Sequence, residues 1–513
     1  MNASSSTSSS GLQFTHPYLA VVLGGGFTGM LAAAALSEHA DVIVVERDRL
    51  PRTPALPTDL PRARHAHLLT TDGARIIESL LPGTVERWLA EGARRIPLPA
   101  GLLGMPPQRP LRRGPRTQHL IACSRDLLDR AIRERVPALY GVSVLETTEA
   151  EQLTGTAEHV TGVRVRDTVT GETYRLDADL VVDATGRHST TPRRLTGLGL
   201  PAAHEEVVDA GVVCATRIFR APAGAENCPP ITVGSDAGGT APGRSATLVP
   251  IEGGRWLVTL SGAGNDGPSQ HAGRFVPFAR GIPNSVIGDL IADAEPLSEV
   301  RLSRDSANRR RRYEQLRSWP TGFVALGGAV ATFNPDYGQG LSIAAHGAAA
   351  LRDALRRHGL DDPLLARGLQ RSIARIIQAP WTLATSQALL SSPGTTGARF
   401  PSASKLVRDT AQRVLHSAVV RPPVCRAYVD IATPAVPVAR LLRPAPDGSP
   451  DAVSSPGPAA SPASSSQTSG DSAALSAVPT ASAPASRRLP RRLGLGPAAL
   501  RRIGGTGKRK PAG

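Results

Sequence analysis

Three short, uninterrupted apolar runs lie far apart along the chain, and each passes directly into a glycine-containing turn. They cover residues 18–23, 180–182 and 322–326. Runs of this length without polar alternation are typical of strands buried on both faces of a parallel sheet. An Ala- and Leu-rich stretch at residues 30–37 predicts a helix after the first run, and residues 41–45 predict the next strand. The pattern therefore predicts an α/β protein whose sheet is assembled from distant segments.

A different pattern occupies the middle of the chain. Between residues 206 and 299, short runs of Thr, Val and Leu alternate with glycine-rich turns, which predicts a separate β-rich region. Residues 341–357 predict a long helix. The helical pattern from 386 to 442, broken near Pro422, predicts a pair of helices on the outside.

Both ends of the chain lack any hydrophobic period. Residues 1–10 are nearly all small and polar, and the segment after Arg443 is dominated by Pro, Ala, Ser and Gly. Such segments cannot bury enough apolar surface to offset the entropy lost on ordering. We therefore expect residues 1–17 and 443–513 to be disordered.

The formal net charge of +16 could indicate a nucleic-acid partner. Its distribution argues against one, because much of the excess lies at the end of the chain, where no acidic residue accompanies it. We expect this tail to adhere weakly to anionic surfaces and predict no specific nucleic-acid partner. The nine cations concerned are Arg487, Arg488, Arg491, Arg492, Arg501, Arg502, Lys508, Arg509 and Lys510.

Cysteine usage and hydropathy narrow the class of protein further. The four cysteines, Cys123, Cys214, Cys228 and Cys425, lie far apart and indicate neither a metal site nor a redox disulfide, which fits a cytoplasmic location. Residues 17–37 carry no charge, but they contain four glycines and lead directly into another strand-like run. We therefore predict no membrane span.

The first apolar run ends in the motif G-x-G-x-x-G, formed by Gly24, Gly26 and Gly29. A helix and a second strand follow, and the second strand ends in Glu46. In such a unit the glycines let the backbone approach a pyrophosphate, and an acid about 20 residues on accepts hydrogen bonds from a ribose. An acid here favours an unphosphorylated ribose, so the sequence predicts FAD or NAD rather than NADP.

Two later motifs make the pattern more specific. Residues 183–189 read Asp-Ala-Thr-Gly-Arg-His-Ser, and residues 327–340 join a Gly-Gly pair to Pro-Asp-Tyr-Gly-Gln-Gly. The chain thus resembles the flavoprotein monooxygenases of the para-hydroxybenzoate hydroxylase fold, which carry G-x-G-x-x-G, a central D-G motif, and a late G-D motif followed by P-x-x-G-x-G. A bacterial subgroup of specialised metabolism, which includes polyether epoxidases, looks similar at residues 64–69, 253–260 and 333–340.

The resemblance implies an α/β fold in which a Rossmann-like FAD-binding domain is joined to a β-rich substrate domain. The chain would then consist of FAD-binding parts at 18–205 and 300–385, a substrate domain at 206–299, C-terminal helices at 386–442, and disordered ends at 1–17 and 443–513.

The resemblance also implies which residues bind the cofactor. The ADP half of FAD would be held by Gly24, Gly26, Phe27, Thr28, Gly29, Glu46 and Arg47. Two further flavin-contacting arginines would be Arg64 and Arg125. The phosphates, and in many members the nicotinamide donor, would contact Asp183, Gly186 and Arg187. The ribityl chain and the isoalloxazine ring would lie beside Gly327, Gly328, Pro335, Gly338, Gln339, Gly340 and Leu341.

The chemistry that the resemblance implies is oxygen insertion. NAD(P)H would reduce FAD, O2 would add at the flavin C4a to give a hydroperoxide, and one oxygen atom would pass to an organic substrate. The reaction would be a hydroxylation or an epoxidation of a hydrophobic, aromatic or polyene small molecule, as in antibiotic biosynthesis. Because the cofactor carries the chemical step, we expect no catalytic side chain and no metal ion.

Gly328 departs from the family pattern, which has an Asp that binds the ribityl hydroxyls. Its loss removes one or two charge-assisted hydrogen bonds, so we expect weaker FAD binding that Gly328→Asp would restore. Two alternatives stay open, namely a reductase of prenyl-type chains on the same fold and a degenerate protein that binds without catalysing. A flavin-dependent halogenase is disfavoured, because the motif W-x-W-x-I-P and an active-site lysine are absent.

Several other conspicuous residues have structural interpretations. His65 and His67 lack nearby partners for a metal, so we expect them to make flavin or structural contacts. Residues 309–312, all Arg, are expected to be solvent-exposed, although guiding an anionic substrate or a nicotinamide phosphate is an alternative. Trp256 is expected to pack in a core, and Asp336 to be an exposed loop acid rather than a base beside the flavin.

The C-terminal tail yields a first testable prediction. A chain that ends near Pro444 should keep its melting temperature and its bound flavin, because the segment beyond contains nothing that can form a core. Calorimetry and the absorbance of bound flavin measure both properties. Loss of folding in the shortened chain would contradict this interpretation of the tail.

Overall fold

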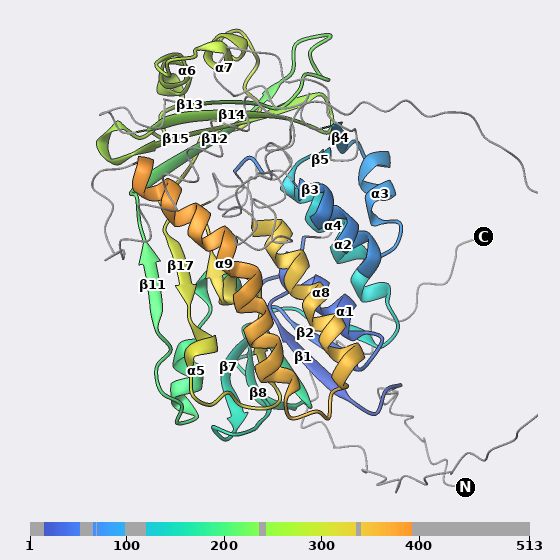
Figure 1. Ribbon diagram of the computed structural model, residues 1–513. Helices are drawn as coiled ribbons and strands as arrows, with labels where there is room; N and C mark the ends of the chain where they lie inside the picture. The colour runs from blue at the N-terminus through green and yellow to red at the C-terminus, as the bar shows by residue number, and fades with distance from the viewer. Residues whose placement is uncertain are drawn as a thin grey trace, which may run out of the picture.

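The computed structural model describes residues 15–51, 65–67, 69–97, 119–234, 243–334 and 340–391. They form two units, each built around its own large sheet, with helices between and outside the sheets (Figure 1). The tails at 1–14 and 443–513 and the segment 392–442 lie outside the described residues.

The first unit is built on a five-stranded parallel sheet with the order β18-β10-β1-β2-β6. Three of its strands are the predicted apolar runs, and both faces of the sheet are covered, which is why β2, β10 and β18 are buried at every position. The predicted α/β class is confirmed. The strands are β1 (Leu19–Leu23), β2 (Asp41–Val45), β6 (Val142–Leu145), β10 (Leu180–Asp183) and β18 (Phe323–Ala325).

Helices from both ends of the described chain cover this sheet. The helix α1 (Phe27–Leu36) packs against α8 (Gly340–His358), and α8 in turn packs against α9 (Leu365–Ser391). The helix α1 begins three residues before the predicted start at residue 30, because Gly26 is its N-cap and the last part of the glycine motif forms its first turn. The unit also contains α2 (Thr71–Leu80), α3 (Thr84–Ala90) and α4 (Arg125–Arg135).

A small antiparallel meander of three strands lies beside the parallel sheet, where its middle strand contacts β10. Its strands are β7 (Thr148–Gly155), β8 (Val160–Asp167) and β9 (Thr173–Asp177).

The second unit is built on a five-stranded sheet with the order β13-β14-β15-β12-β16, whose neighbours are all antiparallel. Two helices, α6 (Ala272–Arg280) and α7 (Val286–Leu290), cover the face that points away from the first unit (Figure 1). Trp256 is fully buried beneath them, in the core role expected for it. The strands are β12 (Val212–Arg220), β13 (Ile231–Gly234), β14 (Arg244–Ile251), β15 (Arg255–Ala263) and β16 (Arg301–Ser303).

The opposite face of this second sheet packs against the first unit. Its apolar contacts join Ile218, Val249 and Leu257 to Ile96 and Leu120. The latter two lie in a three-stranded sheet of β3 (Leu69–Thr70), β4 (Arg94–Pro97) and β5 (His119–Ala122). A further three-stranded sheet consists of β11 (Glu205–Val208), β17 (Asn308–Arg311) and β19 (Ala331–Thr332).

The arginine run at 309–312 was expected to be solvent-exposed, and that expectation is wrong. Arg310 and Arg311 retain only 1% and 4% of their accessible surface. Residues 308–311 form β17, whose antiparallel partner β11 contributes Glu205 and Glu206 as ion-pair partners for the run. The acids lie about a hundred positions earlier in the chain, so the sequence alone did not reveal the pairing.

Within the described residues, no helix is both long enough and apolar enough to cross a bilayer.

Candidate functional site

The carboxyl ends of β1, β2, β10 and β18 lie in register along one edge of the parallel sheet. Leu23 is paired with both Val45 and Asp183, and Asp183 is paired with Ala325. The four strands therefore end at the same level of the sheet, and the chain leaves each of them at this edge. In open α/β sheets the crevice outside these carboxyl ends is where ligands bind. All three predicted motifs begin here.

The first turn is held by close backbone packing. Gly24 has φ +98°, and a Cβ there would lie 2.8 Å from the Ala184 carbonyl oxygen. A Cβ on Gly29 would lie 1.8 Å from the Gly24 oxygen, so only glycine fits. By contrast, a Cβ on Gly26 would meet nothing within 4 Å. Gly24 and Gly29 build the turn, whereas Gly26 faces open space at the N-terminus of α1.

That open space suits a pyrophosphate. The amide groups of the first turn of α1 have no intrahelical partners, and this turn, which includes Phe27 and Thr28, contains no acidic residue. The positive end of the helix dipole therefore meets no acid from its own first turn.

Glu46 closes the side of the same turn. Its Oε2 accepts a hydrogen bond from the Gly25 amide at 2.6 Å, and its Oε1 accepts one from the Asp48 amide at 3.0 Å. These two hydrogen bonds fix the carboxylate beside the glycines. Arg47 has an exposed side chain that pairs with Asp48 at 3.3 Å, and it lines the cavity next to this turn.

A cavity of about 800 Å³ opens from this turn. Its walls include Gly24, Glu46 and Thr185, together with residues of β7 and of the short helix α5 (Thr191–Gly197). The volume lies within the range of small-molecule and cofactor sites, about 300–1,000 Å³. The cavity therefore has room for the adenosine half of a dinucleotide next to the acid expected to hold its ribose.

Asp183, the acid of the central motif, has a structural role in its turn. It is fully buried, and it accepts hydrogen bonds from the Thr185 amide at 2.8 Å, the Thr185 hydroxyl at 2.6 Å and the Ser189 hydroxyl at 2.5 Å. The Thr191 hydroxyl is a further donor. Four donors leave the carboxylate little capacity for a ligand. Gly186, three residues on, has φ +79° and open space where a Cβ would be.

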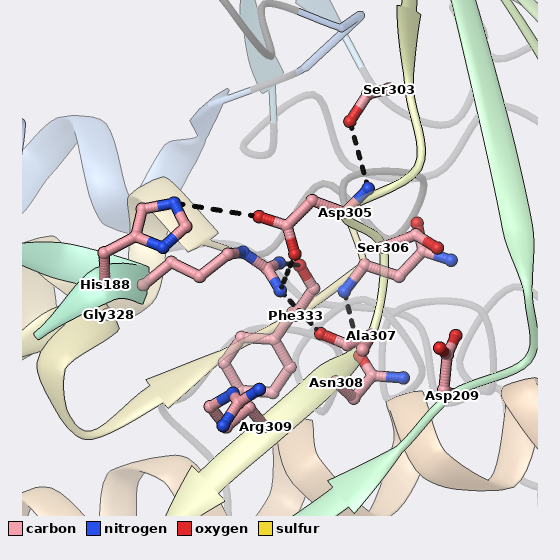
Figure 2. A network of polar contacts seen from close by, with 12 residues as sticks. His188, Asp209, Ser303, Asp305, Ser306, Ala307, Asn308, Arg309, Gly328 and Phe333 are labelled. Atoms are coloured by element: carbon pink, nitrogen blue, oxygen red, sulfur yellow. Dashed lines mark hydrogen bonds and ion pairs between the residues drawn. The ribbon is translucent and has the colours of Figure 1, made fainter. Parts of the chain in front are cut away.

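Arg187 ties this turn to another part of the chain. Its Nη1 donates to Asp305 at 3.1 Å and to the Ala307 carbonyl at 2.8 Å, and its Nη2 donates to the Phe333 carbonyl at 3.2 Å. Burial lowers the pKa of Arg187, and Asp305 opposes that shift. Figure 2 shows His188 directed at the exposed carboxylate of Asp305.

The late turn, Gly327–Ala329, lies against both of the others. Gly327 has φ +55°, and a Cβ there would lie 2.6 Å from the Thr28 hydroxyl. A Cβ on Gly328 would lie 3.0 Å from the Gly186 Cα and 3.2 Å from the Arg187 nitrogen. Three turns that are distant in sequence therefore meet. The contacts at Gly24 and Gly328 are with backbone atoms, and the contact at Gly327 is with the Thr28 side chain.

The remaining predicted cofactor residues fall into two groups. Arg125 begins α4 behind its Ser124 cap, and its guanidinium lies 5.0 Å over the ring of Phe27, beside the first turn of α1. Gly340 and Leu341 begin α8, which has no acidic residue in its first turn. Residues outside the described part of the chain are Arg64, Pro335, Gly338 and Gln339, together with Asp336.

His65 connects the first unit to the second sheet, and the sequence did not reveal this contact. Its Nδ1 lies 2.7 Å from the Thr216 hydroxyl, which lies 2.9 Å from the Thr259 hydroxyl. Burial lowers the pKa of His65 to about 4, so the ring is neutral at pH 7. Among the described residues, no group of three His, Cys, Asp or Glu side chains could hold a metal ion.

Comparisons with known proteins agree with this geometry. A family model described as "FAD binding domain" matches residues 18–358. A curated relative, "Protein Rv3254" of Mycobacterium tuberculosis (strain ATCC 25618 / H37Rv), is 30% identical over 379 residues, which cover 71% of this chain and 78% of the relative.

Two solved structures have a similar fold at low identity. A probable FAD-dependent monooxygenase, pqsL from Pseudomonas aeruginosa, matches with a TM-score of 0.53 and 19% identity, over 74% of this chain and 97% of its own. The myxobacterial chondrochloren halogenase CndH matches with a TM-score of 0.54 and 16% identity, over 79% and 90%. Together with the family match, they confirm the predicted fold, an FAD-binding domain of the para-hydroxybenzoate hydroxylase type.

The open space at Gly26 makes a selective variant available. Gly26→Val should abolish FAD binding, because its branched side chain would occupy the space above α1, yet the folded protein should lose at most about 1 kcal/mol through the poorer N-cap. Flavin absorbance after gel filtration and thermal melting of the apoprotein measure the two effects. Gly29→Ala is the matched control, expected to prevent folding by collision with Gly24. Full flavin occupancy in the Gly26→Val protein would show that this unit binds something else.

The contact at Gly328 changes the expectation that Gly328→Asp simply restores affinity. Any side chain there presses on the Gly186 turn, so Gly328→Ala should destabilise the apoprotein by about 1–3 kcal/mol. Because both variants share that Cβ, their comparison isolates the carboxylate. We expect the Asp variant to bind FAD about tenfold more tightly than the Ala variant, corresponding to about 1.4 kcal/mol. Equal dissociation constants, measured by flavin fluorescence quenching, would mean that no ribityl hydroxyl lies near this position.

Proposed function

Because the chain belongs to the FAD-binding-domain family, whose model spans residues 18–358, we propose that it is an FAD-dependent monooxygenase. It would use NAD(P)H and O2 to insert one oxygen atom into an organic substrate, by hydroxylation or epoxidation. The sequence resemblance favours a role in bacterial specialised metabolism such as antibiotic biosynthesis.

The observation that carries this proposal is the convergence of three turns at the carboxyl edge of the parallel sheet. Gly24 packs on Ala184, Gly327 packs on Thr28, and Gly328 packs on Gly186. Such close contacts leave open space on the outer side of the turns, at Gly26 and Gly186, which is available to an extended ligand. An FAD molecule, with a pyrophosphate between two long arms, has the shape that this edge can hold.

Each part of FAD would meet a different feature of the chain. The amides at the start of α1 would hold the pyrophosphate, and the fixed carboxylate of Glu46 would hold the adenosine ribose. The left-handed backbone at Gly186 and the turn at Gly328, which touch each other, would lie together beside the ribityl chain. Arg125, stacked on Phe27 and ion-paired with Asp129 at 2.7 Å, would place its guanidinium beside this path.

Bound FAD would supply the redox chemistry and the activation of O2, and the residues of the chain would orient the reactants and exclude water. The start of α8, at Gly340 and Leu341, has backbone amides and no acidic residue in its first turn, which suits an anionic reduced ring. On the substrate side, the neutral His65 and the hydroxyls of Thr216 and Thr259 are uncharged hydrogen-bonding groups at the junction of the two units. We propose no catalytic side chain.

Two measurements test the proposal in order. The purified protein should show the two-banded visible absorption of an oxidised flavin, released as FAD on denaturation. Addition of a suitable substrate should then accelerate NAD(P)H oxidation with matching O2 uptake, because reduction and oxygenation are coupled in such enzymes.

The other outcomes identify the alternatives. A colourless protein that takes up no added FAD would indicate the degenerate binding protein and end the proposal. A flavoprotein that reduces prenyl-type chains without consuming O2 would instead be a reductase on the same fold. Oxygen consumption that yields product only when halide is present would indicate a halogenase.

A further inference from the structure

Arg311 is a buried cation at the point where two of the cofactor turns meet. It ends β17, and its side chain keeps only 5% of its accessible surface. Its Nε donates to Glu205 on the neighbouring strand β11 at 3.0 Å, which offsets the buried charge. The remainder of the guanidinium is directed at backbone carbonyls rather than at a second acid.

Those carbonyls belong to both turns. The Nη1 of Arg311 donates to the Ala329 carbonyl at 3.0 Å and approaches the Gly328 carbonyl at 3.4 Å. The Nη2 donates to the Arg187 carbonyl at 3.3 Å. One planar group thus joins the late turn to the central turn. The five donors of a guanidinium, fixed in a plane, can make such a fork, whereas the single ammonium of lysine cannot.

The two turns have no side chain of their own at their closest contact. Gly328 faces Gly186, and even a single added carbon would lie 3.0 Å from the Gly186 Cα. The separation of the turns must therefore be fixed through their backbones. Arg311 contacts the backbone of both, from the strand beside them.

We propose that Arg311 is a positioning residue for FAD. It holds the turn at 186–187 against the turn at 327–329, and the two turns together lie beside the ribityl chain. It acts through the carbonyls of these turns and not by touching the cofactor. The proposal rests on the placement of FAD given under the proposed function, and it assigns to Arg311 the task of holding a site in which the family's ribityl-binding carboxylate is replaced by Gly328.

The neighbouring Arg309 provides a matched control. It lies on the same strand and forms an ion pair with the same acid, Glu205, but its side chain keeps 35% of its accessible surface. Its guanidinium donates a hydrogen bond to Glu205 rather than to a carbonyl of either turn. Arg309→Lys therefore makes the same change of residue type beside the same acid. It leaves the hydrogen bonds from Arg311 to the two turns in place.

The test compares Arg311→Lys, Arg309→Lys and the unaltered protein, each titrated with FAD and with ADP. Flavin fluorescence quenching gives the FAD dissociation constant, and calorimetry gives that of ADP, which reports on the first βαβ unit alone. We expect Arg311→Lys to weaken FAD binding at least about tenfold, corresponding to about 1.4 kcal/mol, and to change ADP binding less than about twofold. Arg309→Lys should change neither.

Two results would overturn the proposal. One is a folded Arg311→Lys protein that binds FAD as tightly as the unaltered chain, and the other is an equal loss of FAD and ADP affinity, which indicates general structural damage. If Arg311→Lys fails to fold, the double variant Glu205→Gln with Arg311→Gln takes its place, because it leaves no unpaired acid. Its loss of FAD affinity is then compared with its loss of ADP affinity in the same way. An unaltered protein that binds ADP but not FAD would instead refute the proposed function.

Discussion

Close backbone contact between glycine turns is the constraint on which the rest of the site depends. Gly29 packs on Gly24, Gly24 on Ala184 and Gly328 on Gly186, and a Cβ at the first two positions would lie within 2.8 Å of a carbonyl oxygen. Three strands from distant parts of the chain end at one edge of the sheet. The turns that follow them can pack together only because glycine occupies the positions of closest contact. The register of the parallel sheet brings them to the same level, and the absence of a Cβ lets them touch.

This constraint explains why polar side chains near the turns serve as scaffold. Asp183 uses its carboxylate to hold Thr185 and Ser189, and Arg187 uses its guanidinium to hold Asp305 and two carbonyls. Turns made of glycine have few ways to hold their own shape. Buried side chains from beside the turns must therefore supply the hydrogen bonds.

Much of the fold could be predicted from the sequence, because buried parallel strands and glycine motifs are local signals. The strand at 41–45 and the long helix after residue 340 were found nearly to the residue. Contacts that depend on pairing across long separations could not be predicted. The arginine run was misjudged because its acids lie on β11, and the stacking of Arg125 on Phe27 joins residues almost a hundred positions apart. Likewise, nothing local to Gly328 reveals that Gly186 occupies the space where its side chain would lie.

The central claim is that the three turns form one FAD site, and a crystal structure of the protein with FAD tests it most directly. The account predicts electron density for the pyrophosphate at the N-terminus of α1 above Gly26, with the ribityl chain passing Gly186 and Gly328. It also predicts that Arg311 keeps its contacts to both turns in the complex. FAD density elsewhere on the molecule, or a site in which these turns have moved apart, would contradict the account.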